Sequence, residues 1–352
     1  TNAPSIISYN LTWTAANSPY YLNSSLTVQQ GVRLTIEPGV VVLANTTNAS
    51  FIVHGELHAI GTNAAAIEIG LNPNASSSVS CWTGITSQRP TAGDSALWLR
   101  NTTISGPSCG YLLQTRYFGR TQMTLNVLDN VTLRDANQVQ FESDYGLARW
   151  DVRNLVLERI GTRYSYSTSS NSARFQFSSF YNQMDGGFAG NVTLIDSHAY
   201  IQYGAYISTG NTPSYGHYYR GSADGWTYRN SSVTFYDSSW WGTPSVTHPL
   251  QISGNFTDSQ LFLQASSSMS YDLHLSHSNF SSTVAPPSWS TGYFVNVESG
   301  SYGKWLVDNN SFEPSNSWQA LQYLYQSARL EANYNWWGSN SSQQIDQNIT
   351  DI

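Results

Sequence analysis

The most frequent chemical motif in this chain is Asn-x-Ser/Thr with x other than proline, the acceptor for N-linked glycans in exported proteins. It occurs fourteen times, spread from one end of the sequence to the other. The acceptor asparagines are Asn10, Asn23, Asn45, Asn48, Asn74, Asn101, Asn130, Asn191, Asn230, Asn255, Asn279, Asn309, Asn340 and Asn348. The composition would produce roughly half as many by chance. The excess predicts a heavily N-glycosylated surface, with covalent N-glycans as partners. The alternative, that a chain rich in Ser, Thr and Asn makes such motifs by accident, stays open.

Paired carboxylates are the second candidate chemistry, because a glycosidase needs two of them about 5–9.5 Å apart. Asp129 with Asp151, or Glu142 with Asp144 and Glu158, could meet on neighbouring strands. The same residues are more simply solvated turn residues, and we assign no catalytic residue.

Histidines raise the question of a metal. His54-Gly-Glu-Leu-His58 places its Glu wrongly for the zinc-protease motif His-Glu-x-x-His, and the segment has the pattern of a strand. We expect both histidines to lie on a strand with their side chains in solvent. We predict neither a metal site nor a cofactor.

Aromatic residues are concentrated between Tyr200 and Trp241. Exposed Tyr and Trp rings stack on sugars and dominate protein interfaces. The candidates for a glycan-binding or subunit-binding face are Tyr215, Tyr218, Tyr219, Trp226, Trp240 and Trp241. The alternative is that these rings stack in the core or under loops.

The elements that must position these residues are short strands. Residues 26–61 alternate apolar and polar side chains in runs of three to five residues, broken at Gln30-Gly31 and Pro38-Gly39. Strands this short, ended by Gly or Pro and without hairpin signals, favour a parallel arrangement. Similar apolar triplets recur along the rest of the chain, with intervening segments rich in Ser, Gly, Pro or Tyr at 72–95, 162–190, 208–230, 240–250 and 283–292. We expect these segments to be surface insertions.

Two motifs carry a resemblance to a known family. Leu-Thr-Ile-Glu-Pro-Gly-Val at 34–40, followed by Gly-Glu-Leu-His-Ala-Ile-Gly-Thr at 55–62, resembles the opening rungs of secreted right-handed parallel β-helix proteins of the pectate-lyase-like type. Ala-Asn-Tyr-Asn-Trp-Trp-Gly at 332–338 is similar to their closing rung, in which paired tryptophans would cover the end of the apolar stack. The resemblance implies an all-β fold, a single-stranded right-handed parallel β-helix (solenoid) with surface loop insertions.

The same resemblance implies one domain over residues 1–352. Residues 1–70 would form the N-terminal cap and regular first rungs, 71–325 irregular rungs with insertions, and 326–352 the closing rung. Relatives usually run on past this rung, so we expect a C-terminal segment to be missing. The catalytic motifs of the polygalacturonases and pectate lyases do not carry over: Gly216-His217, for example, is followed by Tyr218 where Gly is needed.

Cysteine usage indicates an oxidising compartment. Cys81 and Cys109 are separated by nearly one β-helix turn, which would place them on adjacent rungs and predicts a disulfide. Two free thiols are the alternative. Because the sequence begins at Thr1 and contains no apolar run of about 18 residues, we expect a secreted chain without a transmembrane segment, its signal peptide already removed.

Charge is scarce, with 11% charged residues, one lysine (Lys304) and a net charge of −7. Such a chain offers no basic surface for nucleic acid. These features together predict an extracellular structural or adhesive cell-surface protein that self-associates, such as a subunit of a filament, sheath or surface lattice. The alternative is a β-helix that binds or cleaves polysaccharide, as a lyase, glycoside hydrolase or tailspike-like protein.

Overall fold

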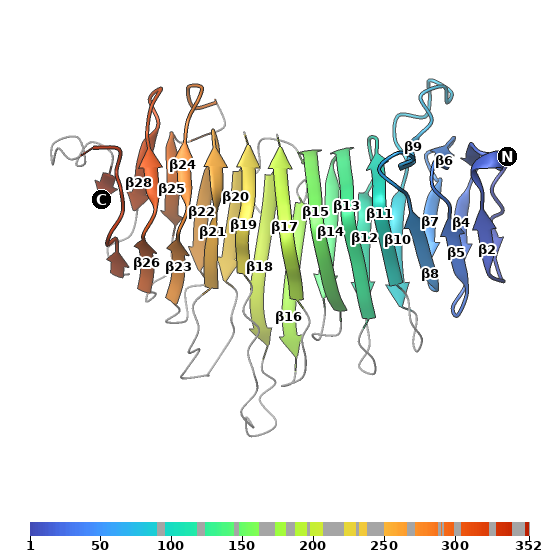
Figure 1. Cartoon of the computed structure of the whole chain (residues 1–352), viewed down its shortest axis with the longest axis horizontal. Coiled ribbons are helices and arrows are strands. Elements are labelled where there is room, and N and C mark those ends of the chain that lie inside the picture. Colours follow the sequence, from blue (N-terminus) through green and yellow to red (C-terminus); the bar gives the residue numbers. More distant parts are fainter. Residues whose placement is uncertain are drawn as a thin grey trace.

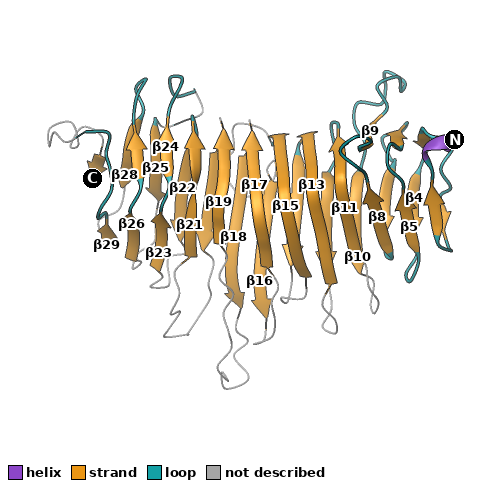
Figure 2. Ribbon diagram, viewed as in Figure 1, coloured by secondary structure: helices purple, strands orange, loops and turns teal. Residues whose placement is uncertain are grey.

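The molecule is elongated, and its strands lie across the long axis with the two termini at opposite ends (Figure 1). The computed structural model describes residues 1–89, 96–117, 124–143, 148–161, 173–180, 187–195, 198–206, 222–229, 232–237, 250–265, 272–287, 290, 292–298, 304–323, 329–339 and 349–351. Within these ranges the structure is all-β (Figure 2), apart from one 3-10 turn, η1, at Ala15–Asn17. None of the described segments is a helix that could cross a membrane.

Thirteen strands form one sheet, called sheet 1. In spatial order they are β1 (Ile6–Ile7), β4 (Ser25–Val28), β7 (Ser50–Val53), β10 (Gly84–Arg89), β12 (Tyr111–Tyr117), β14 (Gln138–Ser143), β16 (Ala173–Phe180), β18 (His198–Tyr206), β20 (Ser232–Asp237), β22 (Gln260–Ala265), β25 (Tyr293–Glu298), β28 (Gln319–Tyr323) and β30 (Ile349–Asp351).

The remaining strands form a second set, called sheet 2. They are β2 (Leu11–Trp13), β3 (Tyr20–Leu22), β5 (Arg33–Ile36), β6 (Val41–Ala44), β8 (Glu56–Ile60), β9 (Ile67–Leu71), β11 (Ala96–Ser105), β13 (Thr124–Ala136), β15 (Ala148–Ile160), β17 (Gly187–Ile195), β19 (Ser222–Arg229), β21 (Leu250–Thr257), β23 (Asp272–Ser276), β24 (Asn279–Ser281), β26 (Lys304–Asp308), β27 (Ser311–Glu313) and β29 (Arg329–Glu331).

Every ladder between these strands is parallel, and sheet 2 contains two series of strands that merge in the middle of the molecule. The first half of β11 pairs with β8, and its second half pairs with β9. The change of partner occurs at Asn101, which has a φ of 44°. The equivalent bends in β13 and β15 occur at Asn130 and Asn154, each with a φ of 56°. A long strand of sheet 2 is therefore two short strands joined by one left-handed residue.

The core lies between the sheets and is built from columns of aligned side chains. One column, called the central column, runs through nearly the whole molecule in continuous register and is buried throughout. Its members are Tyr20, Val42, Ile69, Ile104, Leu133, Leu157, Leu194, Tyr228, Phe256, Phe280 and Phe312. Alternation within each strand places the apolar residue of every strand on this inner side.

The central column changes from aliphatic to aromatic along the chain. Tyr228, Phe256, Phe280 and Phe312 stack in near-parallel pairs with centroids 4.3, 4.4 and 4.7 Å apart. Trp337 continues the stack, 4.7 Å from Phe312. Of the two tryptophans expected to cover this end, Trp337 does so, whereas Trp336 is 44% exposed because it alternates to the outer side.

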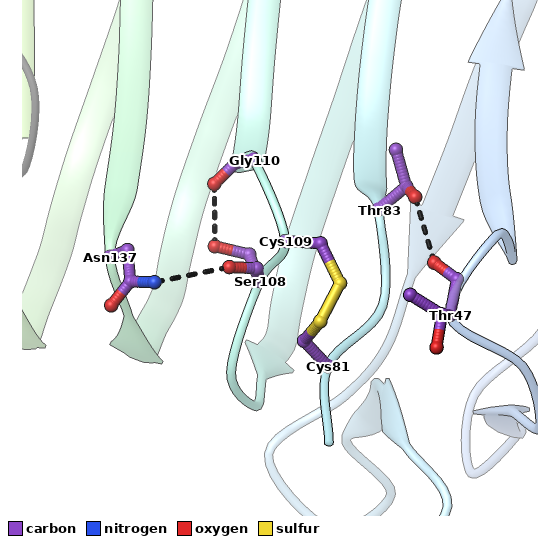
Figure 3. Close-up of a disulfide and its surroundings, with 7 residues drawn as sticks. All are labelled: Thr47, Cys81, Thr83, Ser108, Cys109, Gly110 and Asn137. Carbon is purple, nitrogen blue, oxygen red and sulfur yellow. Dashed lines mark hydrogen bonds between the residues drawn. A yellow bond between two sulfur atoms is a disulfide. The ribbon is translucent and has the colours of Figure 1, made fainter. Parts of the chain in front are cut away.

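The disulfide between Cys81 and Cys109 is present, with Cα atoms 5.3 Å apart. Its half-cystines lie just before β10 and β12, which are neighbours in sheet 1 (Figure 3). Cys109 N–H also donates to the carbonyl of Trp82 at 2.8 Å. The backbone of the two connections is therefore already aligned where the sulfur atoms meet.

The strands predicted for residues 26–61 are confirmed as β4 to β8. Three of the expected insertions are partly wrong, because β10, β16 and β19 lie within 72–95, 162–190 and 208–230 and pair in register with their neighbours. Parallel pairing uses backbone groups, so a strand rich in Ser, Gln or Tyr can still join a sheet when an inward residue packs. The connection between β24 and β25 fits the expected insertion at 283–292.

Candidate glycan-bearing corners

The bends of sheet 2 form a continuous corner, called the first corner, at which the same four-residue pattern recurs. A residue with positive φ is followed by an inward residue, an outward residue and a member of the central column. Asn101, Asn130, Asn309 and Tyr334 hold the first position, with φ between 44° and 57°. Positive φ is sterically unfavourable for L-residues. It is less unfavourable for asparagine, because its short amide can form local hydrogen bonds.

Amide contacts tie neighbouring asparagines together at this corner. Asn101 Nδ2 donates to the carbonyl of Gly61 at 3.1 Å, and Asn130 Nδ2 donates to Asn101 Oδ1 at 2.6 Å. Asn255 and Asn279 occupy the outward position two residues further on, where Asn279 Nδ2 donates to Asn255 Oδ1 at 3.1 Å.

The Asn-x-Ser/Thr pattern coincides with the geometry of this corner. The middle residue of the motif is buried at Thr102, Val131, Phe256, Phe280 and Asn310. The Asn before it and the Ser or Thr after it face away from the core. The geometry of the corner by itself therefore favours this order of residues: Asn at the turn, then an inward-facing residue, then a Ser or Thr that is compatible with a strand.

A second corner follows β3, β6 and β9 and carries a ladder of asparagine amides. Asn23 Nδ2 donates to Asn2 Oδ1 at 3.0 Å, Asn45 to Asn23 at 2.9 Å, and Asn72 to Asn45 at 2.7 Å. The motif asparagines Asn48 and Asn74 lie in the connections from this corner to the next strands of sheet 1.

Solvent exposure separates the motif asparagines from the fully buried asparagines. The structure describes the side chains of ten of them. Eight are exposed and two, Asn45 and Asn101, are half-buried. The exposed ones are Asn10, Asn23, Asn48, Asn74, Asn130, Asn255, Asn279 and Asn309. The fully buried asparagines Asn126, Asn296 and Asn310 do not begin the motif. Every described acceptor is therefore at least partly exposed to solvent.

The described acceptors also lie on one side of the molecule. Nine of the ten lie at the two corners that flank β3, β6, β9, β24 and β27, and Asn10, before β2, is the exception. β6, β9 and β24 run along the upper edge in Figure 1. No described strand of sheet 1 contains an acceptor. The side chain of Asn191 is not described, and Asn230, Asn340 and Asn348 lie outside the described residues.

The predicted aromatic face falls almost entirely outside the described residues, namely Tyr215, Tyr218, Tyr219, Trp240 and Trp241. Trp226 lies in β19 with its backbone in register with Gly254, and its side chain is not described. From the same aromatic segment, Tyr228 belongs to the central column. For that residue the core alternative is correct.

The described carboxylates of the candidate acid pairs are held by arginines. Asp129 Oδ2 lies 2.8 Å from Arg100 Nε, and Glu158 bonds Arg159, which also contacts Asp135. The side chains of Asp151 and Glu142 are not described, and Asp144 lies outside the described residues. The described part of the chain has no group of three or more His, Cys, Asp or Glu that could hold a metal ion.

A cluster that the sequence did not predict lies on the outer side of sheet 2. Arg33 Nε contacts Glu56 Oε2 at 2.6 Å, and His58 Nε2 lies 3.1 Å from the same oxygen. Trp98 stacks on the His58 ring with centroids 5.1 Å apart. The expectation of a solvated His58 is therefore wrong, because Trp98 from the neighbouring strand covers it. Burial, aided by the charge of Arg33, lowers the pKa of His58 against the opposing effect of Glu56.

Comparison of the chain with protein-family models, with curated proteins and with solved structures found no match.

Proposed function

We propose that this chain is a right-handed parallel β-helix that forms the stiff, N-glycosylated body of an extracellular structural or adhesive protein of a cell surface. The fold proposal is supported by the described strands, which pair with one another only in parallel, and by a central column that stays in register from Tyr20 to Phe312. A chain that winds in one direction, adding a strand to each series per turn, produces this pattern.

The observation that carries the functional proposal is the exposure of the acceptor asparagines. Turn geometry alone explains why asparagine stands at the corners, but it does not require that every described acceptor reach solvent while the buried asparagines lack the motif. Glycans are bulky and hydrated. They would supply the hydration that 11% charged residues do not.

An extracellular location is supported by the disulfide, since such bonds persist mainly in oxidising compartments. A polysaccharide-cleaving role is less well supported, because Asp129 and Glu158 are engaged by arginines rather than free to act on a sugar.

Glycopeptide mass spectrometry of the chain isolated from the cells that export it tests the proposal. We expect glycan mass on most of the eight exposed acceptors. Occupancy should be lower at Asn45 and Asn101, because these two side chains are half-buried. Unmodified peptides at all ten described acceptors would overturn the glycoprotein proposal and leave the motifs as turn sequences.

A further inference from the structure

The motif asparagines Asn23 and Asn45 belong to a hydrogen-bonded row of side-chain amides with a fixed direction. Asn45 Nδ2 donates to Asn23 Oδ1 at 2.9 Å, and Asn45 Oδ1 accepts from Asn72 Nδ2 at 2.7 Å. Asn23 Nδ2 in turn donates to Asn2 Oδ1 at 3.0 Å. The donated N–H of each motif asparagine and its C=O therefore point in opposite directions along the row. In a planar amide, this identifies the donated hydrogen as the one trans to Oδ1.

Asn101 at the first corner is held in the same way. Its Nδ2 donates to the carbonyl of Gly61 at 3.1 Å, and its Oδ1 accepts from Asn130 Nδ2 at 2.6 Å. The second amide hydrogen lies cis to Oδ1 and opposite to the Cβ atom, so it points away from the backbone. Each row therefore engages one amide hydrogen and directs the other outward.

Attachment of a sugar replaces one of these two hydrogens. Transfer from a sugar phosphate donor forms a bond between sugar C1 and Nδ2, the phosphate leaves with the electron pair of its C1–O bond, and Nδ2 loses a proton. The product is a secondary amide, which strongly prefers the trans form. In that form C1 takes the outward position, cis to Oδ1, and the hydrogen trans to Oδ1 remains. A glycan is therefore compatible with the hydrogen bond of the row.

The same geometry sets the orientation of the first sugar. In a β-linked pyranose the C1–N bond is equatorial and the C1 hydrogen is axial. The preferred arrangement about the C1–N bond places this hydrogen anti to the amide hydrogen, and therefore parallel to the row. The mean plane of the ring then lies across the row. Rings on neighbouring strands would face one another about 4.8 Å apart, a spacing that suits faces carrying only axial hydrogens.

Asn255 and Asn279 bring two exposed acceptors into this arrangement. They are register partners on β21 and β24, and Asn279 Nδ2 donates to Asn255 Oδ1 at 3.1 Å. The residues that follow them, Phe256 and Phe280, stack in the core with ring centroids 4.4 Å apart. The core packing therefore holds the two outer amides side by side.

We propose that Asn255 and Asn279 are glycosylated together on the same molecule, with their amide–amide hydrogen bond kept and their first sugars stacked face to face. The sugars would be β-linked pyranoses whose other ring substituents are equatorial. The inference rests on the proposed glycoprotein function and names the class of sugar. In the two other neighbouring pairs of motif asparagines, the half-buried member limits how many molecules carry both glycans.

Glycopeptide analysis of the exported chain tests joint occupancy. The sequence has no Lys or Arg between Arg229 and Lys304, so trypsin leaves both asparagines on one peptide. Electron-transfer fragmentation then locates the glycans within single peptides. We expect most peptides with a glycan at Asn279 to carry one at Asn255 as well. Peptides that carry one or the other but never both would overturn the inference.

Nuclear magnetic resonance of the exported chain with labelled asparagine tests the geometry. The remaining Nδ2 hydrogen of glycosylated Asn279 should exchange with solvent more slowly than that of glycosylated Asn74, an exposed acceptor outside the rows. Ring hydrogens of the two first sugars should show cross-relaxation with each other. Equal exchange at Asn279 and Asn74, or no cross-relaxation when both glycans are present, would overturn the inference.

Two substitutions separate the amide contact from the sugar contact. Thr257→Ala removes the glycan from Asn255 but keeps its amide, so slow exchange at Asn279 should persist while the cross-relaxation between sugars disappears. Asn255→Ala removes both, and exchange at Asn279 should become as fast as at Asn74. Circular dichroism would confirm that both variants fold. Slow exchange at Asn279 in Asn255→Ala would contradict the assigned hydrogen bond and overturn the inference.

The two levels of the proposal fail in different ways. Bare asparagines at all ten described acceptors would overturn the glycoprotein function, and this inference with it. Glycans at the other exposed acceptors, together with single occupancy of the Asn255 and Asn279 pair, would overturn only the stacked arrangement.

Discussion

Asparagine has two different roles in this molecule, and the role depends on whether its side chain faces solvent or the core. At the first position of a bend its amide faces solvent and its backbone takes the left-handed conformation. One residue later, at Asn310, the amide is buried and satisfies backbone groups instead. Asn310 Oδ1 accepts from Ser278 N–H at 2.9 Å, and Asn310 Nδ2 donates to the Leu275 carbonyl at 3.0 Å. The inner amide satisfies buried backbone groups, and the outer amide lies at the surface.

Replacing Asn310 with alanine should therefore destabilise the protein. It leaves a buried N–H and a buried C=O without their partner, at a cost of about 1–3 kcal/mol each. Urea denaturation should show a lower midpoint with an unchanged slope. Asn309→Gly, one residue away, is the control and should change stability by no more than about 0.5 kcal/mol, since glycine accepts positive φ. Equal effects of the two substitutions would contradict the assigned roles.

His58 should make stability depend on pH. Because burial holds the pKa of His58 below its ordinary value of 6.5, the folded state binds this proton more weakly than the unfolded state. Its contribution is fully present above pH 6.5, falls as the pH drops from 6.5 to the lowered pKa, and levels off below it. His58→Gln should remove this part of the pH profile of unfolding free energy, whereas His277→Gln, which removes an exposed imidazole, should keep it. A profile unchanged by His58→Gln would show that the ring is not shielded as described.

At the scale of elements, the two halves of the central column use different packing. Near the N-terminus, branched aliphatic side chains stack, as in Val42, Ile69 and Ile104. Nearer the C-terminus flat rings lie face to face at the spacing of neighbouring strands, as in Phe256, Phe280 and Phe312. Since strands in a sheet are about 4.8 Å apart, a ring on each strand fills the column without distortion.

Phe280 is the ring whose loss should cost most in this part of the molecule, because it contacts Phe256, Phe294 and Phe312. Phe280→Ala should lower the unfolding free energy by about 3–5 kcal/mol through the cavity it leaves. Phe280→Leu, which keeps most of the volume, should cost less than about 1.5 kcal/mol. Thermal unfolding followed by circular dichroism separates the two, and equal losses would mean that ring stacking rather than volume dominates.

The sequence predicted elements best where apolar residues alternate regularly. Within residues 26–61 the strands bury alternate side chains, apart from Ser50, and this alternation fixes both the strands and their faces. The sequence did not predict strand β10. Its residues, Gly-Ile-Thr-Ser-Gln-Arg, include a single aliphatic side chain, and the strand pairs through its backbone. The contact of Trp98 with His58 was also out of reach, since it depends on a register between residues 40 positions apart.

At the scale of the whole molecule, the register between strands brings motifs that are scattered in the sequence onto one side of the structure. The acceptor asparagines look evenly spread along the sequence, yet nine of the ten described ones gather on two neighbouring corners. The outer face of sheet 1 carries no described acceptor. Many motifs are separated by about the number of residues between one strand and its neighbour in the same sheet. The sequence alone could not show that they share a side, because that number varies along the chain. A coat on one side would leave the opposite side bare for contacts in a layer or bundle.

The orientation of the strands in Figure 1 also determines how the molecule would bear force. The ladder hydrogen bonds run along the long axis, and covalent chain runs mostly across it. Bending or squeezing the rod meets many packed side chains at once. Pulling on its two ends instead loads the ladder at its outermost strands, which can peel away a layer at a time. Such a molecule resists compression but yields gradually in tension, so an element built from it would absorb a pull by lengthening before it broke.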